Sequence, residues 1–143
     1  MEHRLLGTTG MAVSELCFGT MSFGDVADER TSASLYRRSR EAGIDFFDCA
    51  NVYSAGRAEE ILGSLVGPER NRVVLTTKVG FPMGSDPNDR GLSRRHILAS
   101  IEASLRRLRT DRVEILFVHT FDPSTPIDET LRALDLVVRQ GKA

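Results

Sequence analysis

The chain has 143 residues, which suits one domain with a single core but is shorter than the roughly 200 to 250 residues of a complete (β/α)8 barrel. Hydrophobic residues make up 41% and charged residues 27%, a composition that argues against intrinsic disorder. The formal net charge of -1 gives no electrostatic reason to expect nucleic acid or an anionic membrane as the main partner.

The first predicted element is a short N-terminal hairpin. Residues 4–6 and 11–13 flank a turn that is rich in glycine and threonine. Four apolar runs follow, and none of them alternates polar with apolar residues. Such runs are typical of strands that are buried on both faces of a parallel sheet. The four predicted strands are residues 16–18, 46–47, 73–75 and 115–118.

Each apolar run is followed by a segment whose apolar residues recur at helical spacing. The first helix is expected over about residues 31–42, ending at Gly43, which suits a left-handed cap. The second is expected to begin near Arg57, and the third after Ser93 as its N-cap. The expected apolar faces are Ala58, Ile61, Leu62 and Leu65 in the second helix, and Ile97, Ile101, Leu105 and Leu108 in the third.

A fourth helix is expected after Thr125, with this threonine as N-cap, Pro126 at the first helical position and Asp128 completing a capping box. Its expected apolar face comprises Leu131, Leu134 and Val138. Four strand–helix units in series predict right-handed crossovers and a parallel sheet. The one long connection, residues 80–92, has a length that is often functional or mobile in a compact domain.

Two nucleotide-binding α/β folds are disfavoured by the sequence. Residues 18–24 read FGTMSFG, which does not match the G-x-G-x-x-G motif of a dinucleotide-binding unit. The phosphate-binding motif G-x-x-x-x-G-K-[ST] does not occur either. A barrel-type arrangement remains, and in such an array the active site lies where the strands end and the βα loops begin.

Three consecutive predicted strands end in different titratable side chains, Asp48, Lys78 and His119. Tyr53 lies in the loop five residues after Asp48. Taken singly, each has an ordinary structural interpretation: a turn cap, a solvated lysine, a buried histidine and a packing aromatic. All four interpretations would have to hold at once at the edge of the sheet where the strands end. We therefore interpret Asp48, Tyr53, Lys78 and His119, here called the rim residues, as one site.

These residue types together suggest proton donation to a carbonyl oxygen. A free phenol is a weak acid at neutral pH, and a lysine ammonium close to it favours the ionised form. A carboxylate beside the lysine keeps the ammonium charged and oriented, and a histidine can hydrogen-bond the substrate oxygen. The four residues include no nucleophile and no metal-ligand set, so the chemistry needs an external hydride source, usually a nicotinamide.

The order and surroundings of these residues resemble the aldo-keto reductases. The segments that carry the resemblance are GIDFFDCANVY at residues 43–53, TTKV at 76–79 and TPIDET at 125–130. The family often has threonine where Cys49 stands. The resemblance implies an NAD(P)H-dependent reductase that converts aldehydes or ketones, small carbonyl substrates, into alcohols.

The resemblance also implies a role for each site residue. Tyr53 is the expected general acid, tuned by Lys78 and Asp48, while His119 orients the carbonyl. The end of the first strand in the four-unit array resembles the family segment that lies against the nicotinamide. The expected cofactor-binding residues are Gly19, Thr20 and Met21.

The family fold is an eight-stranded barrel, whereas this chain supplies four strands. We therefore expect an α/β fold in one domain over residues 1–143: a hairpin in residues 1–14, then a parallel (β/α)4 half of a TIM-type barrel in residues 15–143. In the family, most contacts to the adenine, ribose and phosphates of NADP come from the other half, so we expect NADP(H) binding to be weak and activity weak or absent. Two alternatives stay open: a non-catalytic half-barrel, and a subunit that assembles with itself or with a complementary half.

A half-barrel leaves its first and fourth strands unpaired at the edges and its inner sheet face bare. We therefore expect a homodimer or higher homo-oligomer. The arginine pairs at residues 37–38, 94–95 and 106–107 are interpreted as solvated helix faces, with nucleic-acid binding as a remote alternative. With only two cysteines, no apolar run of membrane-spanning length and no apolar signal region at the start, we expect a cytoplasmic protein without membrane attachment.

Overall fold

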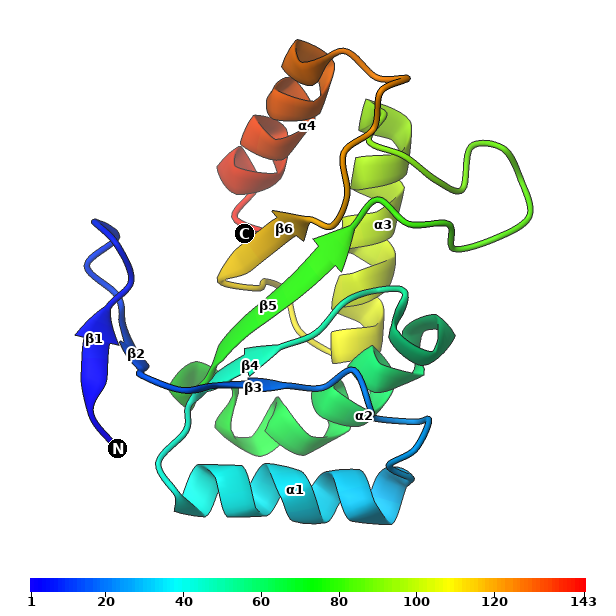
Figure 1. Cartoon of the computed structure of the whole chain (residues 1–143). Helices are drawn as coiled ribbons and strands as arrows, with labels where there is room; N and C mark the ends of the chain where they lie inside the picture. Colours follow the sequence, from blue (N-terminus) through cyan, green and yellow to red (C-terminus); the bar gives the residue numbers. More distant parts are fainter.

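The computed structural model describes residues 1–143 and contains two β-sheets. A small antiparallel sheet pairs β1 (His3–Leu5) with β2 (Ala12–Ser14). The main sheet is parallel, and its strands lie in the order in which they occur along the chain (Figure 1). These strands are β3 (Cys17–Gly19), β4 (Phe46–Asp48), β5 (Val74–Val79) and β6 (Ile115–Val118). The predicted parallel (β/α)4 array with an N-terminal hairpin is confirmed.

Four α-helices follow the four strands of the main sheet and lie together on one of its sides, while the opposite face carries no helix (Figure 1). They are α1 (Glu29–Glu41), α2 (Arg57–Val66), α3 (Arg94–Leu108) and α4 (Ile127–Arg139). Short 3-10 segments occupy Tyr53–Gly56 and Gly67–Arg72. None of the helices combines the length and the hydropathy that crossing a membrane requires.

The helix boundaries follow from local capping. Asp28 caps α1 by accepting a hydrogen bond from the backbone N–H of Thr31 at 2.8 Å, so this helix begins two residues earlier than predicted. Gly43, just past α1, has the expected left-handed conformation with φ of +84°. Ser93 caps α3 as predicted, because its side chain accepts from the backbone N–H of His96.

The prediction for the start of α4 is wrong. Its N-cap is Pro126, which has no side chain that could cap the helix. The Thr125 hydroxyl instead donates to Asp122 Oδ2 at 2.7 Å. A hydrogen bond to a charged carboxylate is a strong one, and Asp122 also accepts from the backbone N–H of Leu92 at 2.8 Å. The threonine therefore belongs to the turn that joins β6 to α4.

The predicted apolar face of α4 is also wrong in part. Leu131 and Val138 are 56% and 59% exposed, and Leu134 is half-buried. The helix turns a row of smaller residues toward the protein instead, because small side chains let it approach α3 closely. The buried residues of α4 are Thr130, Ala133 and Val137.

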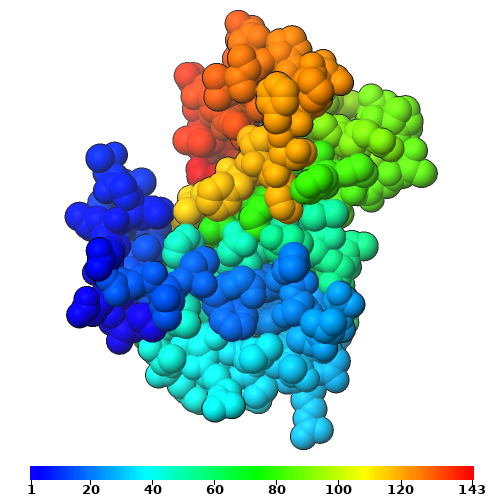
Figure 2. All heavy atoms as spheres, viewed as in Figure 1, coloured from blue at the N-terminus to red at the C-terminus, as the bar shows by residue number.

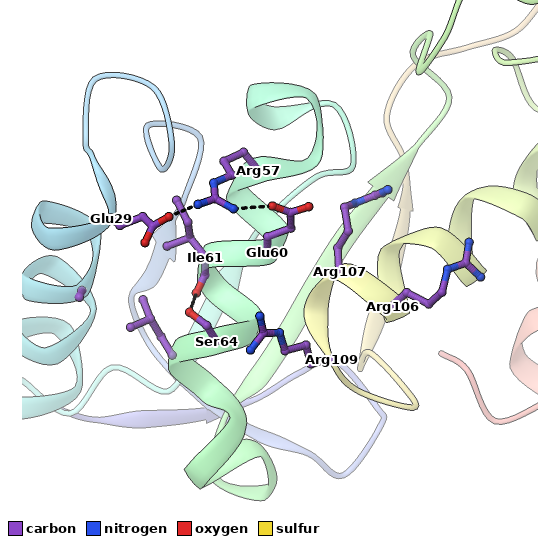
Figure 3. Close-up of a pocket in the computed structure, with 10 residues that line it drawn as sticks. Glu29, Arg57, Glu60, Ile61, Ser64, Arg106, Arg107 and Arg109 are labelled. Atoms are coloured by element: carbon purple, nitrogen blue, oxygen red, sulfur yellow. Dashed lines mark hydrogen bonds and ion pairs between the residues drawn. The ribbon is translucent and has the colours of Figure 1, made fainter.

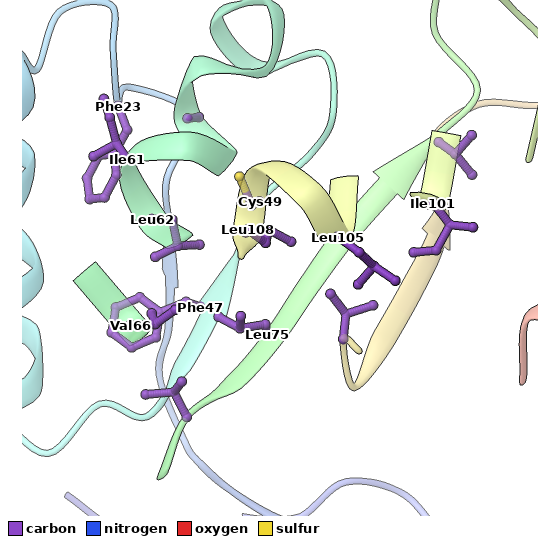
Figure 4. Close-up of a cluster of buried hydrophobic side chains, with 14 of the residues drawn as sticks. Phe23, Phe47, Cys49, Ile61, Leu62, Val66, Leu75, Ile101, Leu105 and Leu108 are labelled. Carbon is purple, nitrogen blue, oxygen red and sulfur yellow. The ribbon is translucent and has the colours of Figure 1, made fainter. Parts of the chain in front are cut away.

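The core lies between the main sheet and its helices (Figure 4). Phe47 of β4 and Leu75 of β5 have no exposed surface, and Leu62 of α2 and Leu108 of α3 cover them from the helix side. α2 and α3 approach each other so closely that a Cβ atom added at Gly63 would lie 2.5 Å from the backbone of Leu108. This contact fixes the spacing of the two helices.

The expectation that all four strands are buried on both faces is wrong for the edge strands. β5 is almost entirely buried, but Phe117 and Val118 of β6 are 43% and 39% exposed. β3 likewise has two exposed residues out of three. The reason is that the helices cover only one face of the sheet, and that each edge strand has a single neighbour.

The hairpin is tied to the start of the sheet by one carboxylate. Asp45, directly before β4, accepts from the backbone N–H of Ser14 at 2.8 Å and lies 2.8 Å from His3 Nε2. Burial alone would raise the pKa of Asp45, but these hydrogen bonds lower it below its ordinary value. The hairpin forms the dark blue projection at one side of the space-filling view (Figure 2), and Figure 1 shows it away from the carboxyl ends of the strands.

Candidate active site

Four side chains gather at one edge of the main sheet, where its strands end. Asp48 is the last residue of β4, and Lys78 is the penultimate residue of β5. His119 directly follows β6, and Tyr53 begins the 3-10 segment after β4. The parallel register sets the ends of β4, β5 and β6 side by side. The structure thus brings together the four residues that the sequence singled out.

Lys78 is the centre of this group. Its Nζ donates to Asp48 Oδ2 at 2.6 Å, to the Tyr53 hydroxyl at 2.9 Å and to the Cys49 carbonyl oxygen at 2.7 Å. Only 13% of its side chain is exposed, and these three bonds use all three donors of the ammonium group. The ammonium is therefore held in one place between a carboxylate and a phenol.

The charge of Lys78 is set by burial and hydrogen bonding, which act in opposite directions. Burial alone would lower the pKa of Lys78, because it removes water from the ammonium group. The hydrogen bonds to Asp48 and Tyr53 favour the charged form and outweigh burial, so the pKa is raised. Lys78 is therefore charged at neutral pH, and it can stabilise negative charge that develops on the phenolic oxygen.

Replacing Asp48 with asparagine is expected to lower the pKa of Lys78. The amide keeps the shape of the side chain but removes the charge that stabilises the ammonium, whereas burial still opposes it. The chain has two lysines, Lys78 and Lys142, so NMR titration with 13Cε-labelled lysine reports both sites. The Lys142 signal serves as the internal control, and an unchanged Lys78 titration in Asp48→Asn would contradict the assigned contacts.

Two threonines hold Asp48, Thr76 from β5 and Thr20 from the position directly after β3. Thr76 Oγ1 donates to Asp48 Oδ1 at 2.7 Å. Thr20 donates twice to the carbonyl oxygen of Asp48, from its backbone N–H and from its hydroxyl, each at 2.9 Å. The sequence reasoning missed Thr76. Its position two residues before Lys78 could have indicated this role, because alternate residues of a strand lie on the same face of the sheet.

His119 stands beside the phenol. Its ring meets that of Tyr53 edge-on, with centroids 5.8 Å apart, and that of Phe81 at 4.7 Å. Burial lowers the pKa of His119, and the Lys78 ammonium lowers it further, while Asp48 opposes the shift. The imidazole is therefore neutral at neutral pH and can offer a hydrogen bond to a carbonyl oxygen.

The three residues predicted to contact a nicotinamide lie at the end of β3. Thr20 is fully buried, and its hydroxyl is engaged with Asp48. Met21 is 68% exposed, and a Cβ atom added at Gly19 would have no other atom within 4 Å. Met21 and Tyr53 line the same hollow, about 600 Å³ in volume. There is thus open space over the end of β3 for a flat ring.

A second hollow of about 600 Å³ lies between α1, α2 and α3, away from the four rim residues (Figure 3). Arg57 crosses it and pairs with both Glu29 and Glu60. Arg106 and Arg109 line its other side. Apart from Arg107, the titratable groups here are ordinary surface arginines and glutamates, so the hollow does not change the location of the candidate site.

The interpretation of residues 106–107 as a solvated face holds for Arg106 but is wrong for Arg107. Arg107 Nε donates at 2.7 Å to Glu59 Oε2, and the Glu59 side chain has no exposed surface. Only 21% of the Arg107 side chain is exposed. A buried carboxylate requires a charged or hydrogen-bonding partner, and Arg107 meets this requirement.

Comparison with known proteins gives a consistent picture. The sequence model described as "Aldo/keto reductase family" matches residues 15–143. A "Probable voltage-gated potassium channel subunit beta" of Arabidopsis thaliana is 44% identical over 147 residues, which cover 100% of this chain and 44% of that protein. The protein of the same description in Oryza sativa subsp. japonica is 42% identical over the same shares.

A bacterial relative, "Uncharacterized oxidoreductase YrpG" of Bacillus subtilis (strain 168), is 45% identical over 154 residues. This alignment covers 99% of the chain and 47% of the relative. The chain thus spans about half the length of these curated relatives.

Proposed function

This chain belongs to the aldo/keto reductase family, and from that premise we propose that its rim site reduces an aldehyde or ketone to an alcohol, with NADP(H) as the hydride carrier. The observation that carries the proposal is the position of Lys78 Nζ, within 3 Å of both the Tyr53 hydroxyl and Asp48. The match to an oxidoreductase relative supports the general class of reaction.

In the proposed mechanism, a carbonyl oxygen lies between the Tyr53 hydroxyl and the neutral His119 ring. The carbonyl carbon needs a hydride, which a reduced nicotinamide held at the end of β3 would supply. Tyr53 donates its phenolic proton to the carbonyl oxygen, which completes the alcohol. The resulting phenolate is stabilised by the Lys78 ammonium until water restores the proton. Asp48 keeps Lys78 charged throughout.

The space over β3 fits the proposed cofactor ring. Gly19 offers no side chain there, and Met21 presents an apolar surface that a flat ring can cover. Gly19 and Met21 would hold the nicotinamide end by direct contact. Thr20 is fully buried and bonded to Asp48, so it would support this segment from behind. The chain spans about half the length of its relatives and would hold the cofactor mainly at the nicotinamide end, so we expect an NADPH Kd far above the micromolar range.

Titration of NADPH fluorescence and of NADPH consumption with a small aldehyde tests the proposal. We expect weak, saturable binding and turnover that depends on both the aldehyde and the chain. Saturable binding without turnover would support the non-catalytic half-barrel instead. No binding even at millimolar NADPH would contradict a nicotinamide-dependent role for this chain.

The relatives carry two kinds of description, channel subunit and oxidoreductase. For this chain the side-chain contacts favour a reductase. The buried lysine is shared between a carboxylate and a phenol, and its ammonium lies against the phenolic oxygen. The same arrangement directly serves proton transfer.

The open edges of the main sheet support self-association. β3 and β6 each have one unpaired edge, and the face without helices exposes Phe117, which lies opposite Lys78 in the strand register. Pairing of these edges between two copies would cover both, so we expect a homodimer in solution. Sedimentation or light scattering measures this directly. A well-folded monomer at micromolar concentration would show that the exposed sheet does not drive association.

A further inference from the structure

A buried ion pair lies behind the rim site, on the side of the sheet that the helices cover. Glu59 of α2 has no exposed surface. It accepts a hydrogen bond from Thr77 Oγ1 at 2.5 Å and from Arg107 Nε at 2.7 Å. One carboxylate thus joins three elements: α2, β5 and α3.

The first link reaches Lys78. Thr77 precedes Lys78 in β5, and successive side chains of a strand point to opposite faces. The hydrogen bond from Thr77 to Glu59 therefore anchors the strand from its helix side at the residue next to Lys78. Any shift of β5 along or away from α2 would carry the Lys78 backbone with it.

The second link reaches the loop of Tyr53. A Cβ atom added at Gly56 would lie 2.8 Å from Cδ and Nε of Arg107, so the arginine packs directly against this residue. Gly56 ends the turn that Tyr53 begins, and the two residues between them, Ser54 and Ala55, have φ of 49° and 53°. L-residues rarely adopt this conformation, so the surrounding contacts must hold the turn in place.

A third contact lies on the same side. Asn51, two residues before Tyr53, donates its backbone N–H to the carbonyl oxygen of Lys78 at 3.3 Å. Its side chain is buried and, together with Arg107, lines a small cavity of about 170 Å³. The loop of Tyr53 and the strand of Lys78 are therefore joined at Asn51, a residue that lines the same cavity as Arg107.

We infer that Glu59 is a positioning residue for the proton-transfer site: through Thr77 and Arg107 it fixes the Tyr53 hydroxyl against Lys78 Nζ. This inference rests on the proposed function, but the contacts of Glu59 with Thr77 and Arg107 do not depend on cofactor or substrate. The alternative is that the pair serves only the stability of the core. The cost of removing two charges from water can cancel their attraction, so a buried ion pair by itself is weak evidence for a stabilising role.

The test compares Glu59→Gln with Glu60→Gln, its neighbour in α2. Gln at position 59 keeps an oxygen for Thr77 but loses the charge that holds Arg107, whereas Glu60 pairs with Arg57 at the surface. NMR titration with 13Cε-labelled lysine then follows Lys78. In Glu59→Gln we expect a shifted Lys78 signal and a titration displaced to lower pH, because its hydrogen bonds weaken while its burial remains. Glu60→Gln is expected to match wild type.

Thr77→Val keeps the inference testable if Glu59→Gln does not fold, because valine has nearly the same shape and removes only the hydrogen bond to Glu59. A folded variant whose Lys78 signal and titration equal those of wild type would overturn the inference. Where turnover is measurable, misplaced groups should lower kcat by about 10- to 100-fold with little change in KM. The NMR result stands without turnover, so failure of the inference and failure of the proposed function are distinguishable.

Discussion

Replacing Tyr53 with phenylalanine is expected to lower the rate of aldehyde reduction by about 10²- to 10⁴-fold, the contribution typical of a positioned general acid. The variant loses the hydroxyl that Lys78 contacts at 2.9 Å but keeps the aromatic ring beside His119. The measurement is the rate of NADPH consumption at saturating aldehyde. The melting temperature, measured in parallel, reports whether the fold is retained.

The matched control is Tyr36→Phe, which changes the only other tyrosine of the chain. The Tyr36 hydroxyl donates to Glu69 at 2.6 Å, on the helix side of the sheet. Its loss should cost about 1.5 to 3 kcal/mol of stability, the usual contribution of a hydrogen bond to a charged group, and leave turnover unchanged. Equal rates in Tyr53→Phe and Tyr36→Phe would rule out Tyr53 as the proton donor.

Replacing Gly63 with alanine is expected to reduce the free energy of unfolding by at least about 2 kcal/mol. This loss is expected although alanine has a higher helix propensity than glycine. The added Cβ would lie 2.5 Å from the carbonyl carbon and oxygen of Leu108 and 2.6 Å from its Cα. These are backbone atoms, so no side chain can rotate away and α2 must separate from α3. Urea unfolding followed by circular dichroism measures the loss.

Ser64→Ala is the control for this effect, because it introduces the same residue at the next position of α2 on the exposed side. Its unfolding free energy should lie within about 0.5 kcal/mol of wild type. If Gly63→Ala proves as stable as Ser64→Ala, the two helices are not packed as closely as the structure describes.

The rim residues could be predicted from the sequence because parallel strands bring their ends to one edge. Asp48 and Lys78 are far apart in the chain, yet both end short apolar runs, and this alone makes them neighbours. His119 follows from the same rule. The predicted order of strands and helices depended equally on local patterns, and these patterns agree with the observed elements.

The residues behind the sheet could not be predicted in this way. Arg106 and Arg107 are identical in type and adjacent in sequence, and only the rotation of α3 against α2 decides which one meets Glu59. The same limit explains the error in α4. Hydrophobic patterning selects its larger residues, such as Leu131, whereas the observed contact with α3 uses small ones, such as Ala133.

The order of the main sheet also bears on how the chain reaches its folded state. Each strand pairs only with the strand before it and the strand after it in sequence, and β3 makes no pairing with β6. Every pairing therefore closes a loop of one strand–helix unit, whose entropic cost grows only slowly with length. During synthesis, β4 can dock on β3, β5 on β4 and β6 on β5 as each unit leaves the ribosome, so the half-barrel can assemble vectorially from its amino end.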